Sequence, residues 1–143
     1  MNKTSDIIAA KLLTYTGVLP FFICIAAILL NVQQVNGAFI AICYGAVIAS
    51  FLSGIHWGIY LLSAQQFPVN LFILSNVTAL FAWLSLLMPY SGGLFLQILC
   101  FGYLLMLDYR LFKENIIPNW YYQLRVEATG VVILACIILA DIS

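Results

Sequence analysis

The chain has 143 residues, of which 65% are hydrophobic and only 7% are charged, with five Lys and Arg against five Asp and Glu. A soluble domain has about 45–50% apolar and about 25% charged residues, so ten charges cannot cover the surface of a soluble fold. Residues 12–107 contain no Asp, Glu, Lys or Arg, and apolar runs of about 18 residues or more are typical of membrane spans. The composition excludes a soluble enzyme and a disordered tail. The lack of a basic patch excludes a nucleic-acid binder. The apolar composition and the long charge-free run therefore predict an integral membrane protein, whose partner is the lipid bilayer.

Polar turns at 33–37, 63–68 and 89–93 divide the charge-free region. Asn-Gly at 36–37 and Pro-containing segments are typical turn signals, and a helix needs about 20 residues to cross a bilayer. We therefore predict an all-α bundle that forms a single domain over residues 1–143. Its transmembrane helices are expected at about 12–32, 38–62, 69–88, 94–112 and 120–141.

An odd number of spans places the two termini on opposite sides of the membrane. The side of the N-terminus then carries every positive residue of the chain, namely Lys3, Lys11, Arg110, Lys113 and Arg125. Because positively charged loops stay on the inner side of a membrane, the sequence predicts the N-terminus inside and the C-terminus outside.

Small residues recur every four positions along the second predicted span. One stripe holds Ala46, Ser50, Gly54 and Gly58, and the adjacent stripe holds Ala41, Gly45, Ala49 and Ser53. Small side chains let transmembrane helices approach closely. We therefore expect the second span to lie centrally, with helix packing assigned to Gly45, Ala46, Ser50, Gly54 and Gly58, and we expect Gly54→Leu to disrupt the fold.

Polar side chains within the spans mark the candidate site. A charge at the centre of a membrane helix costs roughly 2.5–3.5 kcal/mol on insertion scales, so such residues face a partner or a water-filled cavity. We expect the candidates to converge in the inner leaflet as ligand-binding or proton-handling residues. They are Ser53, His56, Trp57, Asn76, Asp108, Arg110, Arg125 and Thr129.

His56 is the single histidine of the chain, and a buried imidazole needs a hydrogen-bond partner. It is either a proton-handling or ligand-binding residue in an inward-facing cavity, or a structural residue that joins two helices. Asp108 and Arg110 are two positions apart and point in different directions on a helix, so we expect Asp108 to pair with Arg125 or His56. The alternative to a functional role for Asp108 is an ion pair that locks the fourth and fifth helices.

Motifs for metal binding and catalysis are missing from the sequence. The four cysteines lie in four different predicted spans and form no C-x-x-C pair. They are Cys24, Cys43, Cys100 and Cys136. A single histidine without clustered thiols or carboxylates offers too few metal ligands, and no nucleophile–base pair or phosphate loop is recognisable. We predict a protein without metal, cofactor or catalytic residues, and therefore not an enzyme.

The stretch of residues 44–58, YGAVIASFLSGIHWG, resembles the most characteristic segment of an uncharacterised domain family of small multi-pass membrane proteins. That family includes bacterial inner-membrane proteins and the animal mitochondrial transmembrane protein 69. Further similar segments are Gly17 to Phe21, Asp108 to Leu111, Ile117 to Tyr121, and Leu124, Arg125 and Thr129. The resemblance implies a five-helix protein of a bacterial or mitochondrial inner membrane, and it supports the importance of His56, Trp57, Asp108 and Arg125 without naming their task.

The sequence thus predicts a multi-pass protein of the bacterial inner membrane with a non-enzymatic role. We expect it to bind a membrane protein complex or a hydrophobic, lipid-like small molecule through a polar cavity around His56, and a homo-oligomer stays open. The alternative is a small proton-coupled carrier or channel that uses His56 and Asp108. A water-accessible cavity that reaches His56 would favour a carrier or a ligand site, whereas a sealed core with an exposed small-residue face would favour a partner role.

Overall fold

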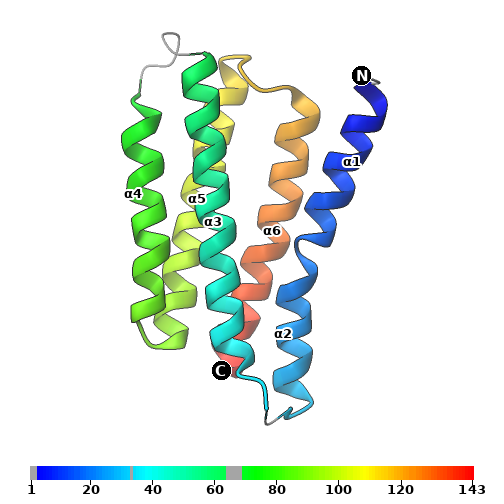
Figure 1. The fold of residues 1–143 in the computed structure, drawn as a ribbon, viewed down its shortest axis with the longest axis vertical. Helices are drawn as coiled ribbons and strands as arrows, with labels where there is room; N and C mark the ends of the chain where they lie inside the picture. Colours follow the sequence, from blue (N-terminus) through cyan, green and yellow to red (C-terminus); the bar gives the residue numbers. More distant parts are fainter. Residues whose placement is uncertain (1–2, 33, 64–68) are drawn as a thin grey trace.

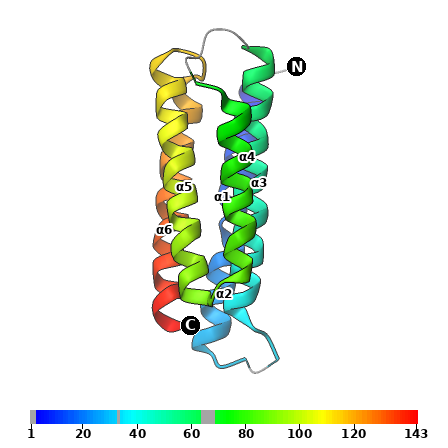
Figure 2. The same ribbon diagram turned by 90° about the vertical axis from the view of Figure 1, so that its left-hand side faces the viewer.

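The computed structural model describes residues 3–32, 34–63 and 69–143. Across these residues the chain consists of helices joined by turns and contains no strand, which confirms the all-α prediction. Long helices run side by side in a bundle, and α1 begins at the end of the bundle opposite to the one where α6 ends (Figures 1 and 2). The elements in chain order are α1 (Lys3–Thr16), α2 (Leu19–Leu29), α3 (Gly37–Leu62), α4 (Leu71–Leu84), the 3-10 turn η1 (Ser85–Leu87), α5 (Tyr90–Lys113) and α6 (Asn119–Ile142).

The membrane character of the bundle follows from the length and composition of its helices. Three helical segments of the described chain are long and apolar enough to cross a membrane, namely Thr4–Leu29, Gly37–Leu62 and Tyr90–Lys113. The segment Leu71–Leu87 is apolar but shorter. The turn predicted at 63–68 lies almost entirely outside the described residues, while the turns at the other end of the bundle join α2 to α3 and η1 to α5. The chain is therefore a helical membrane bundle.

The first predicted span, at about 12–32, is interrupted after Thr16, and α1 and α2 together make up the apolar segment Thr4–Leu29. Pro20 has no N–H group, and its ring clashes with the carbonyl four residues earlier, so the helix breaks between α1 and α2. At the break the amide of Phe21 bonds to the carbonyl of Val18 at 3.2 Å, and this leaves the carbonyl of Gly17 without its helical donor. The hydroxyl of Tyr44 on α3 donates to that carbonyl at 2.7 Å, so the break is satisfied inside the protein, as a membrane interior requires.

The helices pack in neighbouring pairs. α5 packs along α6, α3 packs along α4, and α2 fits against α3 and α6, whereas α1 touches mainly α6. The main core lies where α2, α3, α5 and α6 meet, and it is built from Phe21, Ala41, Ala49, Leu94, Phe101, Leu104, Ala135 and Leu139. Because α1 leans away from α3 above the break (Figure 1), this part of the bundle is less tightly filled than the core.

The two small-residue stripes on α3 contribute unequally to packing within the chain. Ala41, Gly45 and Ala49 of one stripe are buried, whereas of the other stripe only Ala46 lies in the core. A Cβ atom added to Gly45 would collide with the side chain of Gln97 on α5, so Gly45 permits a close approach of the two helices. By contrast, Gly54 and Gly58 have no atom within 4 Å of an added Cβ, and Ser50 is exposed. Within the described chain, Ser50, Gly54 and Gly58 therefore have no packing role, because this part of α3 points out of the bundle, and the effect of Gly54→Leu stays a prediction.

Candidate functional site

One buried carboxylate joins three helices in the half of the bundle where α1 begins. Oδ1 of Asp108 on α5 lies 2.9 Å from Nε2 of His56 on α3, and Oδ2 accepts a hydrogen bond of 2.8 Å from Nε of Arg125 on α6. The exposed fractions are 1% for His56, 1% for Asp108 and 6% for Arg125. The sequence left open whether Asp108 pairs with His56 or with Arg125, and in the structure it pairs with both.

The position of Asp108 follows from the helical repeat of α5. It continues the buried face that holds Gln97, Phe101 and Leu104, and this face looks toward α3 and α6. Arg110, two residues further on, is exposed. The predicted divergence of Asp108 and Arg110 is therefore observed, and Arg110 takes no part in the buried cluster.

The charges of this cluster balance. Because a carboxylate only accepts hydrogen bonds, Nε2 of His56 carries the donated proton, and a neutral imidazole then has its lone pair on Nδ1. Arg125 and Asp108 cancel each other, so the cluster is neutral as long as His56 is neutral. Nδ1 of His56 is buried and has no hydrogen-bond partner among the described residues. In the part of the chain that the structure describes, no three His, Cys, Asp or Glu side chains gather closely enough to hold a metal ion.

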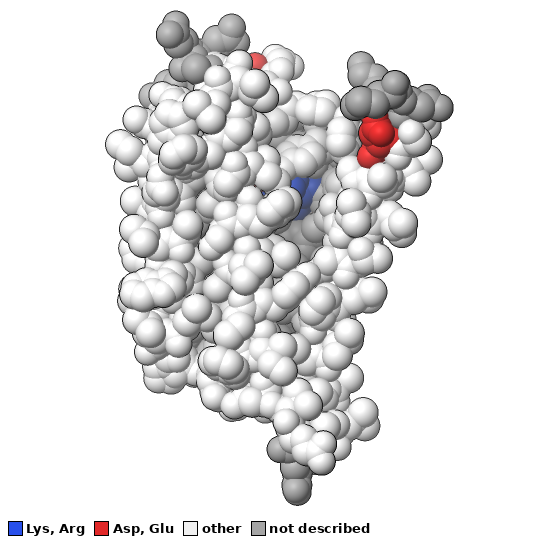
Figure 3. Space-filling model, in the orientation of Figure 1, with Lys and Arg blue, Asp and Glu red and all other residues white. Residues whose placement is uncertain are grey.

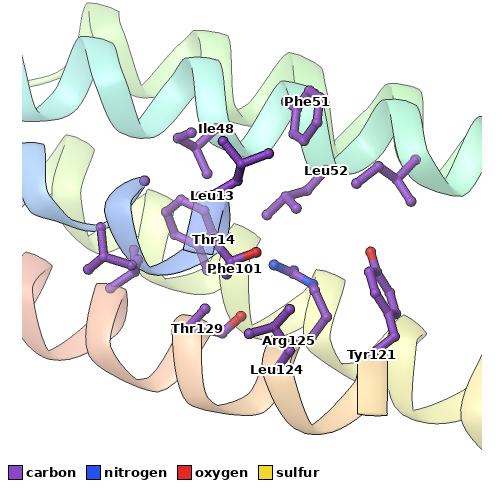
Figure 4. Close-up of a pocket in the computed structure, with 15 residues that line it drawn as sticks. Leu13, Thr14, Ile48, Phe51, Leu52, Phe101, Tyr121, Leu124, Arg125 and Thr129 are labelled. Carbon is purple, nitrogen blue, oxygen red and sulfur yellow. The ribbon is translucent and has the colours of Figure 1, made fainter. Parts of the chain in front are cut away.

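A cavity of about 190 Å³ lies beside the cluster, where α1, α3 and α6 face one another. Figure 3 shows the hollow on the surface of the bundle with a positively charged side chain inside it, and Arg125 is the one Lys or Arg that lines the cavity among the described residues. Figure 4 shows Arg125 and Thr129 reaching from α6, opposite Leu52 of α3. The wall is otherwise largely apolar, with Leu13, Ile48, Phe51, Phe101, Leu124, Ala128 and Val132.

Two polar groups beside this cavity lack partners. Nη2 of Arg125 and Oγ1 of Thr129 are buried without a hydrogen bond to any described residue. Both residues lie on one face of α6, at positions i and i+4, and both line the cavity. The arrangement can therefore offer an N–H donor and a hydroxyl to a molecule that enters the cavity.

Several predicted site residues lie elsewhere. Ser53 is buried, but its hydroxyl donates to the carbonyl of Ala49 at 2.9 Å. Trp57 is 41% exposed and contacts the ring of Phe72. Asn76 is exposed and donates to a carbonyl of its own helix at 2.8 Å, because its side chain faces away from α3. With the exposed Arg110, these residues fall outside the site, which comes down to His56, Asp108, Arg125 and Thr129.

Two polar contacts between helices escaped the sequence analysis. Nε2 of Gln97 donates to the carbonyl of Ile42 at 2.7 Å and to Oγ of Ser85 at 2.9 Å, and a glutamine inside an apolar span was an available signal. The hydroxyl of Tyr15 on α1 donates to the carboxylate of Glu127 on α6. No sequence pattern links these two residues, since their contact depends on how α1 is tilted at the break between α1 and α2.

The comparisons with known proteins place this geometry in a family. Residues 7–140 match the profile of a family described as "Protein of unknown function (DUF3429)". The curated Transmembrane protein 69 of Xenopus tropicalis is 31% identical to this chain over 133 residues, which cover 90% of the chain and 52% of that protein. The chain thus spans about half the length of this relative. No solved structure matches the chain.

Proposed function

We propose a function for this chain, which belongs to the DUF3429 family of proteins of unknown function: it is a non-enzymatic membrane protein that binds a hydrophobic small molecule from the bilayer. The observation that carries the proposal is the pair of unpartnered groups on Arg125 and Thr129, two residues that line a cavity whose wall is largely apolar apart from Thr14 and Tyr121. Buried polar groups are almost always hydrogen-bonded, and the cost of leaving them unpaired is largest where no water can replace the missing partner. A ligand that supplies an acceptor at this point would remove that cost.

The dimensions of the cavity support a lipid-like ligand. Sites that enclose drug-sized molecules have about 300–1,000 Å³, whereas this cavity has about 190 Å³. It therefore accommodates a head group, while an apolar chain extends outward. Leu13 and Phe51, which line the cavity, are 71% and 66% exposed on the lateral surface of the bundle, so the chain would lie against them among the lipid tails.

The accessibility of His56 favours binding over proton-coupled transport. A carrier that uses His56 and Asp108 needs water to reach the imidazole, but His56 is 1% exposed and is not part of the cavity wall. The polar cavity that we expected around His56 instead borders Arg125 and Thr129. We therefore propose that His56 and Asp108 support the site without exchanging protons with either side of the membrane.

The proposed setting is a bacterial inner membrane with the N-terminus of the chain on the cytoplasmic side. Arg110, Lys113 and the beginning of α1 lie at the same end of the bundle (Figure 1), and positive residues favour the inner side. In this orientation the cavity opens toward the inner leaflet. A partner complex or a homo-oligomer would use the exposed face of α3 that carries Ser50 and Gly54, and either would be compatible with the ligand site.

The proposal is tested by purifying the full chain in mild detergent and identifying co-purifying lipids, quinones and proteins by mass spectrometry. Ala128→Phe places a ring in the cavity, and Leu80→Phe on the exposed face of α4 is the matched control. We expect a small molecule with the natural chain and the control, and at least a tenfold lower amount with Ala128→Phe. Should Ala128→Phe not fold, Leu52→Phe takes its place. Equal amounts in all variants, or a co-purifying protein without any small molecule, would overturn the proposal.

A further inference from the structure

We infer that the site selects an uncharged head group with a carbonyl-type oxygen, which Thr129 and Arg125 hold together. This inference rests on the proposed function, because it names the chemistry of the molecule that enters the cavity. It adds a specificity-determining residue, Thr129, and excludes anionic lipids and fatty acids as the preferred ligand.

The hydroxyl of Thr129 differs from the hydroxyls of Thr14, Thr16 and Thr78, which bond to their own helices. Thr14 and Thr78 each donate to the carbonyl four residues earlier, both at 2.8 Å, which is the usual solution for a hydroxyl in an apolar helix. Thr129 is 2% exposed and makes no such bond. Its hydroxyl therefore has no partner on its own helix, and Thr129 is one of the residues that line the cavity (Figure 4).

Arg125 supplies the second donor in a fixed orientation. Its Nε is bound to Asp108 at 2.8 Å, which holds the plane of the guanidinium and leaves Nη2 without a partner. Thr129 follows one turn later on the same face of α6, and the guanidinium lies in the cavity beside it (Figure 4). Because the two residues lie one turn apart on the same face and line the same cavity, we expect both to donate to one carbonyl oxygen, which has two lone pairs.

The charge of the head group follows from the balance of the cluster. Arg125 is already neutralised by Asp108, so an anionic head group would bring one uncompensated negative charge into a cavity with a largely apolar wall, which is unfavourable. The nearby Glu127 accepts a hydrogen bond from the hydroxyl of Tyr15, so this contact supplies no positive charge that could balance an anionic head group. A neutral carbonyl oxygen supplies the acceptor without changing the net charge.

The test compares four probes that differ in their head groups: decylubiquinone, methyl palmitate, palmitate and hexadecane. Binding to the full chain in maltoside micelles is measured by native mass spectrometry with titrated ligand. We expect one of the two carbonyl probes, the quinone or the ester, to bind at least tenfold more tightly than palmitate or hexadecane. The tighter of the two identifies the source of the carbonyl.

Thr129→Val removes the hydroxyl at nearly constant shape, and Thr78→Val is the matched control whose hydroxyl serves its own helix. Loss of one hydrogen bond of about 1–1.5 kcal/mol corresponds to a roughly 5- to 13-fold weaker binding of the carbonyl probe. Hexadecane should bind equally to both variants, and Thr129→Ser should restore most of the affinity for the carbonyl probe. Tightest binding of palmitate, or equal effects of Thr129→Val and Thr78→Val, would overturn the inference and leave the proposed function intact. If no probe binds the natural chain, the proposed function itself fails.

Discussion

Replacing Asp108 by asparagine should be among the most damaging single substitutions in the chain. The asparagine would keep the shape of the side chain and one acceptor oxygen, but it would remove the negative charge that faces Arg125 at 2.8 Å and His56 at 2.9 Å. Because Arg125 is 6% exposed, its guanidinium would stay buried without a counter-ion. Removing one partner of a buried pair costs about 3–5 kcal/mol, and we expect this loss in the free energy of unfolding.

The assay is reversible unfolding by SDS in mixed micelles, followed by circular dichroism. The exposed Arg110 provides the control: Arg110→Gln should change the free energy of unfolding by less than about 0.5 kcal/mol. His56→Asn, which removes one charge-assisted hydrogen bond, should cost about 1.5–3 kcal/mol. If Asp108→Asn unfolds at the same SDS fraction as Arg110→Gln, the carboxylate is not the junction of α3, α5 and α6, and the account of the site given above is refuted.

Three further predictions concern packing, the position of α1 and orientation. Gly45→Ala should cost about 1–3 kcal/mol because the added methyl group overfills the contact with α5, whereas Gly54→Ala should be neutral or should stabilise α3 by up to about 1 kcal/mol; SDS unfolding measures both. Tyr15→Phe should remove the bond to Glu127 and speed amide hydrogen exchange in α1 at least severalfold, while exchange in α5 stays unchanged. An exchange rate in α1 equal to that of the natural chain would show that the bond does not hold α1. Alkaline phosphatase fused after Ser143 should be active and green fluorescent protein at the same place dark, whereas the opposite pattern would reverse the proposed orientation.

The fold class and the buried cluster could be predicted because both follow from the cost of polar groups in lipid. Ten charges in 143 residues leave only a membrane protein, and a histidine and an aspartate inside apolar spans must find partners. The number of candidate partners was small, since Arg125 and His56 were the groups at a matching depth. The helical repeat then separated Asp108 from Arg110, and the structure places the first inside the bundle and the second on its surface.

The faces of the helices could not be assigned from the sequence alone. The repeat shows that Ala46, Ser50, Gly54 and Gly58 share one side of α3, but it does not show whether a neighbour lies there. The same limit explains Asn76, which satisfies its amide on its own helix and so tolerates an outward position. The break after α1 had a local signal in Pro20, but the resulting tilt, and therefore the cavity, depends on how α1 meets α6 in three dimensions.

The structural and functional interpretations of the cluster depend on each other. An ion pair that only locked two helices could bind both ends of the guanidinium, yet Asp108 engages Nε and leaves Nη2 without a partner. The carboxylate thereby fixes the direction of the arginine and cancels its charge, and His56 occupies the second oxygen, which prevents Asp108 from drawing the guanidinium further inward. Under the proposed function, the buried pair would be the support that lets Arg125 present an N–H donor, without a net charge, to a molecule from the bilayer. For this reason variants of His56 should act on ligand affinity through the position of Arg125, and binding by stably folded His56 variants should weaken for carbonyl probes more than for hexadecane.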